Sequence, residues 1–169
     1  MSQLGLAYDE KLCIACYGCK IACKSSRELS LGIDFCRLDK KWVGRDLNTR
    51  LVYFAVFCQQ CVDPPCVASC PANALAKGAD GLVAVDSGKC VACRACLDAC
   101  PFNVPQFAEG AKMSKCDLCK GVLAQGEEEP PCVLTCPTHA LTLAQMSVDD
   151  KKAQEARFKK FMDMPKFEE

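Results

Sequence analysis

The chain has 169 residues, 17 of them cysteine, and its 21 basic side chains are balanced by 21 acidic ones. This length suits one domain or two very small ones. Zero net charge without a basic block argues against a nucleic-acid-binding protein, and a single histidine excludes most hydrolase layouts. The cysteines therefore have to carry the functional argument.

The N-terminal segment, Met1 to Asp9, lacks the pattern of a secretory signal peptide. No apolar run approaches the length of a membrane-spanning helix, so we expect no direct membrane insertion. We expect a cytoplasmic protein, because thiols stay reduced there and cysteine-rich patterns bind metals. Export together with a partner that carries a signal is the alternative.

Sixteen cysteines form four groups of four along the chain. Groups one and three have the spacing C-x2-C-x2-C-x3-C, and groups two and four lengthen only the middle gap. Proline follows the last cysteine in groups two to four, whereas Lys24 stands there in group one. In chain order the groups are Cys13, Cys16, Cys19 and Cys23; Cys58, Cys61, Cys66 and Cys70; Cys90, Cys93, Cys96 and Cys100; and Cys116, Cys119, Cys132 and Cys136.

This spacing is typical of iron–sulfur proteins. Three cysteines two residues apart wrap one [4Fe–4S] cube, and the fourth ligates the other cluster of a two-cluster pair. Zinc sites usually use two separated C-x2-C pairs, so the third cysteine at short spacing favours iron–sulfur clusters over zinc. A zinc-containing structural or assembly protein is the alternative. We expect each fourth cysteine to begin a short helix.

The sequence also repeats internally. Cys70-Pro-Ala-Asn-Ala-Leu75 matches Cys136-Pro-Thr-His-Ala-Leu141, which places His139 opposite Asn73 as an ordinary residue before a strand. The repeated unit is a ferredoxin-like half of strand, cluster loop and helix, so the predicted fold class is α+β. Short helices are expected after the closing cysteines. Short strands are expected at Leu4–Tyr8, Leu75–Lys77, Leu82–Val85 and Ala140–Leu143.

Residues 24–57 lie between the first two groups and are expected to form an inserted hairpin or loop, with a strand at Leu51–Phe57. Cys36, the seventeenth cysteine, is interpreted as a small buried residue, in preference to a redox switch. Trp42 either packs on the cluster core or contacts a partner, because tryptophan is enriched at interfaces.

Residues 146–169 are predicted to form a helical tail. Ser147 and Asp150 resemble a capping box at its start. An incomplete apolar stripe follows, and we favour packing of this stripe on a partner over packing on the chain itself. The stripe consists of Ala153, Ala156, Phe158, Phe161 and Met162.

Cross-ligation between groups allows two wirings. Group two can pair with group three while group one pairs with group four, which nests one module inside the other. Alternatively, the groups pair sequentially, one with two and three with four. The internal repeat does not separate these wirings.

The whole pattern resembles the four-cluster iron–sulfur subunit of the dimethyl-sulfoxide reductase family of molybdenum and tungsten oxidoreductases. The resemblance runs from about residue 6 to about residue 145, and it includes the unequal gaps. It is carried by Cys58-Gln-Gln-Cys-Val-Asp-Pro-Pro-Cys66 with Cys70-Pro71, Asp80-Gly-Leu-Val-Ala-Val-Asp86, Cys90-Val-Ala-Cys-Arg-Ala-Cys96, Cys100-Pro-Phe-Asn-Val-Pro105, and Lys115-Cys-Asp-Leu-Cys119 with Pro131-Cys132.

The resemblance implies the nested pairing and four [4Fe–4S] clusters, because all sixteen positions are cysteine. It implies two modules related by a pseudo-twofold axis: residues 1–23 with 101–145, and residues 58–100. The four implied ligand sets are named here A to D. They are set A, Cys13, Cys16, Cys19 and Cys136; set B, Cys23, Cys116, Cys119 and Cys132; set C, Cys58, Cys61, Cys66 and Cys100; and set D, Cys70, Cys90, Cys93 and Cys96.

The function implied is non-catalytic. Such a subunit relays single electrons between a large molybdenum- or tungsten-pterin subunit and a second donor or acceptor, which is a flavin subunit, a ferredoxin, or a membrane quinone or haem subunit. A free polyferredoxin, or an adaptor of a hydrogenase or formate lyase, is the alternative. Arg94 and Lys20 lie within or beside cluster loops and are candidate residues for tuning the cluster potentials.

Overall fold

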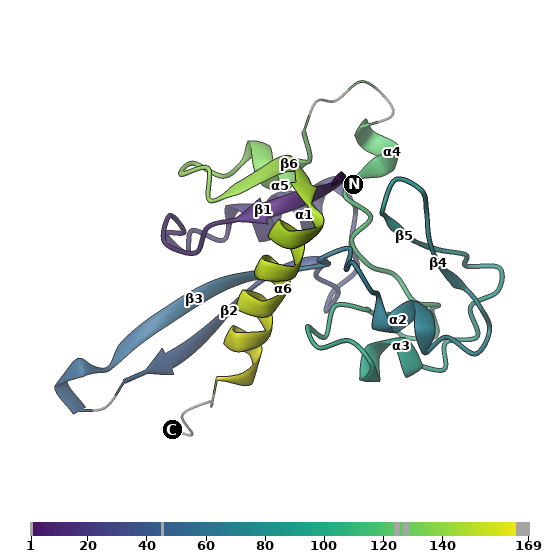
Figure 1. Ribbon diagram of the computed structural model, residues 1–169, viewed down its shortest axis with the longest axis horizontal. Coiled ribbons are helices and arrows are strands. Elements are labelled where there is room, and N and C mark those ends of the chain that lie inside the picture. The colour runs from purple at the N-terminus through teal and green to yellow at the C-terminus, as the bar shows by residue number, and fades with distance from the viewer. Residues whose placement is uncertain (1, 45, 124–125, 127–128, 165–169) are drawn as a thin grey trace.

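The computed structural model describes residues 2–44, 46–123, 126 and 129–164. In this part of the chain the strands form three two-stranded antiparallel sheets, β1–β6, β2–β3 and β4–β5. Short helices surround them (Figure 1), which confirms the expected mixture of small helices and strands. No helix among these residues is long and apolar enough to cross a bilayer.

The elements follow one another in chain order, and η1 denotes a single 3₁₀ turn. They are β1 Ser2–Tyr8, α1 Gly18–Ser26, β2 Cys36–Val43, η1 Asp46–Asn48, β3 Arg50–Phe57, α2 Pro65–Ala68, β4 Leu75–Lys77, β5 Val83–Val85, α3 Ala95–Asp98, α4 Lys120–Leu123, α5 Pro131–Leu134, β6 Leu141–Ser147 and α6 Val148–Asp163.

The first sheet joins the two ends of the chain. β1 runs antiparallel to β6, with Tyr8 opposite Leu141, and the two strands lie side by side in Figure 1. Leu6, Tyr8 and Leu141 are buried, as expected for one face of a strand pair with period-two alternation. The pairing brings the first cysteine group beside the fourth, because group one follows β1 and group four precedes β6.

The β4–β5 hairpin, with helices α2 and α3, occupies the other side of the molecule (Figure 1). Leu75 pairs with Val85, and Lys77 pairs with Val83. Gly81 in the connecting turn has φ +80° and faces the Gln3 side chain at 2.6 Å from the position that a Cβ would take. Glycine suits this turn because it adopts positive φ without strain and leaves room for Gln3.

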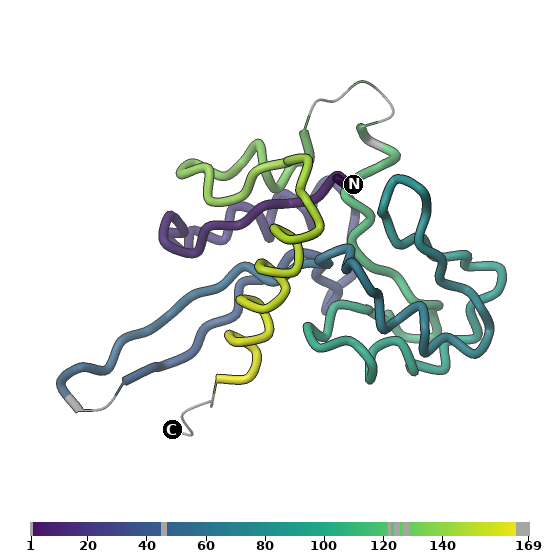
Figure 2. Tube along the Cα trace, in the orientation of Figure 1, coloured from purple at the N-terminus to yellow at the C-terminus, as the bar shows by residue number. Residues whose placement is uncertain are grey.

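Residues 24–57, expected to contain a hairpin, hold β2 and β3 in antiparallel register from Cys36–Phe57 to Val43–Arg50. The end of the hairpin near Phe57 is buried in the core. The other end projects away from the rest of the molecule in Figure 2. Trp42 is 45% exposed there, so it does not pack into the core.

Helices do not begin at the closing cysteines, which corrects one expectation. In groups two to four the short helices α2, α3 and α5 begin one residue before the third cysteine and end before the fourth. Proline opens α2 and α5 as Pro65 and Pro131, a position where its fixed φ and missing N–H cost nothing. The proline after the closing cysteine belongs to a turn.

The predicted capping box of α6 is confirmed. The Ser147 hydroxyl accepts a hydrogen bond from the Asp150 N–H, and the Asp150 carboxylate accepts one from the Ser147 N–H. This exchange satisfies two N–H groups that the helix itself leaves unpaired. Residues 165–169 of the expected tail lie outside the described residues.

The buried face of α6 differs from the expected stripe. Ala153 and Ala156 are exposed, whereas Lys151 and Gln154 are buried with Phe158 and Phe161. Polar side chains fit here because they find partners: the Gln154 amide donates to the Leu6 carbonyl at 2.8 Å and accepts from the Tyr8 N–H at 3.0 Å. The helix therefore packs on this chain, and the expectation that it packs on a partner is wrong.

An aromatic cluster fixes α6 to the hairpin. The rings of Phe54 and Phe161 stack with centroids 4.6 Å apart, and Phe158 meets Tyr8, Phe54 and Phe57 edge-on. The Lys41 ammonium of β2 donates to the three carbonyls of Phe161, Met162 and Met164, each at 2.7 Å. A cation at the C-terminal end of a helix also opposes the helix dipole.

Replacing Phe158 with alanine is expected to lower the free energy of unfolding by about 3–5 kcal/mol, because it leaves a cavity in this aromatic cluster. Anaerobic denaturant unfolding followed by circular dichroism measures the change. Ala156→Gln, on the exposed side of the same helix, is the matched control and should stay within about 0.5 kcal/mol. An equal loss for both variants would contradict the packing described.

Candidate metal centres

The four cysteine loops share one unusual backbone conformation. The residue before the second cysteine has positive φ in every group: Ala15 58°, Gln60 49°, Ala92 57° and Leu118 56°. This conformation costs a residue with a Cβ about 1–2 kcal/mol. Its recurrence at the same position in all four loops indicates a common geometry that turns consecutive cysteine side chains toward one interior.

A second recurrent turn follows the closing cysteines. Asn73, Asn103 and His139 have φ of 48°, 50° and 52°, and each N–H donates to the carbonyl of the closing cysteine at 3.2 Å. Asparagine and histidine tolerate this region better than most residues. His139 is therefore a turn residue, in agreement with its place opposite Asn73 in the repeat.

Group one departs from the others after its last cysteine, where Lys24 replaces proline. α1 continues through this position to Ser26, and the Arg27 N–H closes the helix on the Cys23 carbonyl at 3.2 Å. Gly18 allows α1 to approach α5, since a Cβ there would lie 3.1 Å from the Thr135 side chain. This contact brings groups one and four together.

Three of the four predicted sets each surround a cavity. The three cavities are similar in size and small, about 20 Å³ each. Each combines three cysteines of one group with the closing cysteine of another. The cysteines lining them are Cys13, Cys16, Cys19 and Cys136; Cys58, Cys61, Cys66 and Cys100; and Cys70, Cys90, Cys93 and Cys96.

The members of set B are also close together. Burial raises the pKa of Cys132 to about 12, and the neighbouring Cys23 and Cys119 add to the shift. Burial likewise raises the pKa of Cys116, with contributions from Cys132 and Cys23. The four sulfurs thus influence one another electrostatically, as the sulfurs of sets C and D also do.

The chemistry of the cavity linings fits iron–sulfur clusters. In the described residues, no three histidine, cysteine, aspartate or glutamate side chains come close enough to hold one metal ion. The sulfurs line cavities whose other walls are largely apolar, such as Val83, Phe102 and Val104 around set C. Four buried thiolates in such surroundings need positive charge inside the cavity, which a cluster of iron supplies.

Cys36 is buried, as expected, and it touches two ligand sets. Its thiol donates a hydrogen bond to Cys19 of set A, which lowers the pKa of Cys19 to about 7. Its backbone N–H donates to the sulfur of Cys23 of set B. No sequence pattern indicates this position between two sets, because the contacts depend on β2 passing beside α1.

The two candidate tuning residues have partners. The Lys20 ammonium forms an ion pair with Asp34 at 3.0 Å, which offsets its charge near set A. The Arg94 guanidinium lies 5.5 Å from the centroid of the Phe107 ring and lines the set D cavity. Their effect on cluster potentials remains a prediction.

Sequence reasoning missed Gln60, a buried link between distant segments. Its side-chain amide donates to the Cys116 carbonyl at 2.9 Å and accepts from the Val83 N–H at 2.8 Å. The Gln3 amide donates to its backbone carbonyl at 2.8 Å. Its place inside the second cysteine loop was visible in the sequence, but its long-range partners were not.

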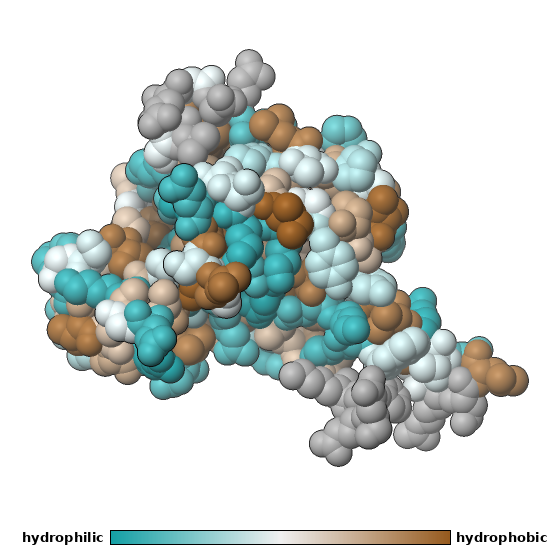
Figure 3. All heavy atoms as spheres, turned by 180° about the vertical axis from the view of Figure 1, so that it is seen from behind, coloured by the Kyte–Doolittle hydropathy of each residue, from teal (hydrophilic) through white to brown (hydrophobic). Residues whose placement is uncertain are grey.

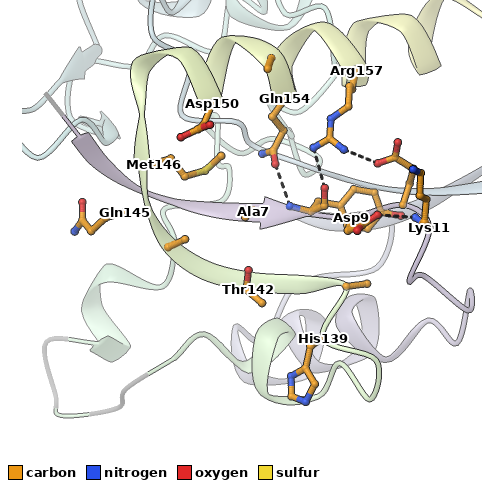
Figure 4. Close-up of a pocket in the computed structure, with 15 residues that line it drawn as sticks. Ala7, Asp9, Lys11, His139, Thr142, Gln145, Met146, Asp150, Gln154 and Arg157 are labelled. Atoms are coloured by element: carbon orange, nitrogen blue, oxygen red, sulfur yellow. Dashed lines mark hydrogen bonds and ion pairs between the residues drawn. The ribbon is translucent and has the colours of Figure 1, made fainter.

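A groove lies over β1, β6 and α6, and no cysteine lines it (Figure 4). Arg157 spans it, donating to Glu10 at 2.8 Å and to the Tyr8 carbonyl at 3.0 Å. Gln154 points from α6 toward β1, while His139 lies on the far side of β6 in this view. Arg157 and Gln154 therefore join the helix to β1 and to the residue Glu10 that follows it.

Exposed apolar side chains occur close to two exposed cysteines. Cys16 of set A lies between Ile14, 63% exposed, and Tyr17, and Cys93 of set D lies near Val91, 68% exposed. Over the rear face, apolar and polar residues are intermixed (Figure 3). Sets A and D thus each have a cysteine at the molecular surface.

Comparison with known proteins gives consistent matches. A family model described as a 4Fe-4S dicluster domain matches residues 49–146. The B subunit of anaerobic dimethyl sulfoxide reductase from Escherichia coli (strain K12) is 35% identical over 161 residues, covering 89% of this chain and 78% of that protein. The B subunit of polysulfide reductase from Wolinella succinogenes is 36% identical, covering 86% and 78%. The thiosulfate reductase electron transfer subunit PhsB of Salmonella typhi is 32% identical, covering 86% and 77%.

The turn after the fourth group allows a direct test of the backbone argument. His139→Asn is expected to leave stability unchanged, because asparagine occupies the equivalent turns at Asn73 and Asn103. His139→Val should lower the free energy of unfolding by about 1–2 kcal/mol, because a β-branched residue is strained at positive φ. Denaturant unfolding of the iron-loaded protein measures both. A large loss with asparagine would point instead to a role for the imidazole.

Proposed function

Because the chain belongs to the iron–sulfur subunits of the dimethyl-sulfoxide reductase family of molybdenum and tungsten oxidoreductases, we propose that it is the electron-transfer subunit of such a reductase complex. It relays single electrons through four [4Fe–4S] clusters between a molybdenum- or tungsten-pterin catalytic subunit and a second redox partner. The observation that carries this proposal is a set of three cavities, each lined by three cysteines of one group and the closing cysteine of another.

We propose sets A to D as the ligands of the four clusters, with nested pairing of the groups. The cavity of set A supports this wiring because it combines Cys136 of group four with cysteines of group one. The cavities of sets C and D likewise exchange Cys100 and Cys70 between groups three and two. Sequential pairing would require Cys136 to join group three.

The proposed modules are residues 1–23 with 101–145, and residues 58–100, related by a pseudo-twofold axis. The β1–β6 and β4–β5 pairs support this division, since each joins the strands that flank one pair of groups. The short contacts of α1 with α5 and of α2 with α3 add to it: the Ser69 hydroxyl donates to the Ala95 carbonyl at 3.4 Å. Residues 24–57 and 146–169 are the proposed additions to this core.

The sets follow one another in a linear order. Cys36 contacts both Cys19 of set A and Cys23 of set B. Burial is the main cause of the raised pKa of Cys116 of set B, and Cys58 of set C adds to it. Burial also raises the pKa of Cys66 of set C, and Cys96 of set D contributes to that shift. The order is A, B, C, D, and the exposed cysteines at both ends are the proposed points where electrons enter and leave.

When bound, each cluster takes up and gives back one electron. The chain's own residues do the rest of the work. The loops hold the sulfurs, apolar side chains such as Val104 keep water out of the cavities, and nearby N–H groups and charges set the potentials. We propose no catalytic role for this chain, because His139, its single histidine, is occupied in a turn.

The proposed partners are a large pterin-containing subunit and a flavin subunit, a ferredoxin, or a membrane quinone or haem subunit. We propose the cytoplasm as the compartment, with export beside a signal-bearing partner as the second candidate. A free polyferredoxin, or an adaptor of a hydrogenase or formate lyase, is the competing function. The apolar side chains beside Cys16 favour a subunit that is partly covered by a partner.

Anaerobic purification from the source organism tests the function. A large stoichiometric partner containing molybdenum or tungsten should co-purify, with about sixteen irons per copy of this chain. Mass spectrometry and metal analysis give both results. Elution of the chain alone with the same iron content would favour the polyferredoxin, and zinc in place of iron would contradict both functions.

Single substitutions test the wiring. Cys136→Ser and Cys16→Ser should alter the same electron paramagnetic resonance signal, because both residues belong to set A. Cys93→Ser should alter a different signal, that of set D. If Cys136→Ser instead reproduced the change caused by Cys93→Ser, sequential pairing would be correct.

A further inference from the structure

Three lysines from separate parts of the chain surround set C. Lys115 is 6% exposed and lines the set C cavity itself. Lys151 of α6 is 2% exposed, and Lys77 of β4 is half-buried. Buried lysines are rare because removing an ammonium from water is costly, so this gathering beside one cavity calls for a physical reason.

Lys77 and Lys115 are held by neutral groups. The Lys77 ammonium donates to the carbonyls of Cys61 and Val62, both at 2.8 Å. The Lys115 ammonium donates to the Cys116 carbonyl at 3.1 Å, at the junction between sets B and C. Carbonyl partners fix the ammonium groups in place without cancelling their charge.

Lys151 approaches the same loop from the other side. Its ammonium lies 3.1 Å from the position that a Cβ would take on Gly5, so it runs directly against the β1 backbone. Burial lowers its pKa, while Glu155 and the sulfurs of Cys61 and Cys58 oppose that shift. Lys151 and Lys77 also act on each other, which places both beside the Cys61 loop.

Glu155 is the acidic group that opposes these cations. Its carboxylate accepts a hydrogen bond from the Val62 N–H at 3.0 Å, and it raises the pKa of Cys61 further after burial. The three lysines and this one carboxylate together carry a net positive charge. Charges close to a partly buried site are weakly screened, so this net charge acts on the cavity.

Cations near sets A and B are placed differently, and at set D the guanidinium of Arg94 lines the cavity. Lys20 and Lys24 share the carboxylate of Asp34 beside set A, at 3.0 Å and 3.5 Å. Arg27 beside set B pairs with Asp117 at 3.0 Å. Beside sets A and B a carboxylate pairs with the cation, whereas the ammonium groups of Lys77 and Lys115 donate to backbone carbonyls.

We propose that Lys77, Lys115 and Lys151 give the set C cluster the highest reduction potential in the chain, so that an electron entering the chain rests there. Reduction adds one negative charge inside the cavity, and three nearby ammonium groups stabilise that charge. The inference rests on the proposed function. It assigns an electron store to an interior position, one set away from the exposed Cys93.

Potentiometric titration followed by electron paramagnetic resonance tests the proposal on the anaerobically purified complex, with dithionite as reductant. Lys115→Met, Lys77→Met and Lys151→Met should each lower the potential of the highest-potential signal and of no other. We expect at least a tenfold change in its ratio of oxidised to reduced form at the wild-type midpoint, which equals about 59 mV for one electron. Cys100→Ser, at a ligand of set C, identifies that signal by removing or altering it.

Two controls separate charge from structure. Lys115→Arg keeps the charge and should restore most of the wild-type potential. Lys159→Met removes an exposed lysine of α6 that pairs with Asp163 at the surface, and it should leave all the potentials unchanged. If Lys115→Met loses iron, the Lys77→Met and Lys151→Met variants, which do not alter the cavity lining, decide whether the proposal holds.

Iron-loaded variants with unchanged potentials would overturn the proposal, and so would equal shifts of all signals or a highest-potential signal unaffected by Cys100→Ser. The proposed function fails by different results. Absence of iron would refute the electron-transfer role itself. Elution without a pterin subunit would refute the complex, and the titration could still be made on the isolated chain.

Discussion

A thiolate is stable in an apolar interior only beside positive charge, and most cysteines of this chain are buried or half-buried and meet that condition. Burial raises the pKa of Cys66 to about 11 and that of Cys132 to about 12, which expresses the cost of holding these sulfurs as anions without metal. Iron removes that cost. The rest of the fold is arranged to bring four sulfurs at a time around one apolar cavity.

This requirement explains why the regular structure is so short. The strands pair only two at a time, and the helices of groups two to four consist of single turns that carry the third cysteine of each group. One sizeable aromatic cluster exists among the described residues, where α6 crosses β1 and the hairpin through Phe158 and Phe161. Apart from that cluster, the cysteine sets take the place that a continuous hydrophobic core has in most domains of this size.

The sequence predicted what local spacing controls. The strands at Leu75–Lys77 and before Cys90, the capping box at Ser147, and the turn role of His139 all follow from patterns within a few residues. The sequence did not predict features that depend on contacts between segments far apart in the chain. Ala153 and Ala156 have the right spacing for a buried stripe, yet Gln154 is buried because it finds partners on β1.

The same distinction between local spacing and long-range contacts applies to the candidate site. Candidate ligands are recognised by their spacing, so the sixteen cysteines could be proposed from the sequence. Lys77, Lys115 and Lys151 were not, because nothing in the sequence tells that β4, the fourth cysteine loop and α6 converge on one cavity. Lys20, which did stand out, has its charge offset by Asp34, which lies well beyond the motif that drew attention to it.

The pairing of β1 with β6 has a consequence for how the chain matures. In the proposed wiring, residues 58–100 leave the ribosome as a continuous stretch, so both ligand sets of that proposed module are complete early in synthesis. Cys13, Cys16 and Cys19 emerge first of all, but their fourth partner in set A is Cys136, and β1 finds its neighbour only when Leu141–Ser147 has been made. Newly made chains therefore expose three thiols of set A for most of translation. The loop that is made first is the last to receive its cluster, and its thiols are the most vulnerable to oxygen before assembly ends.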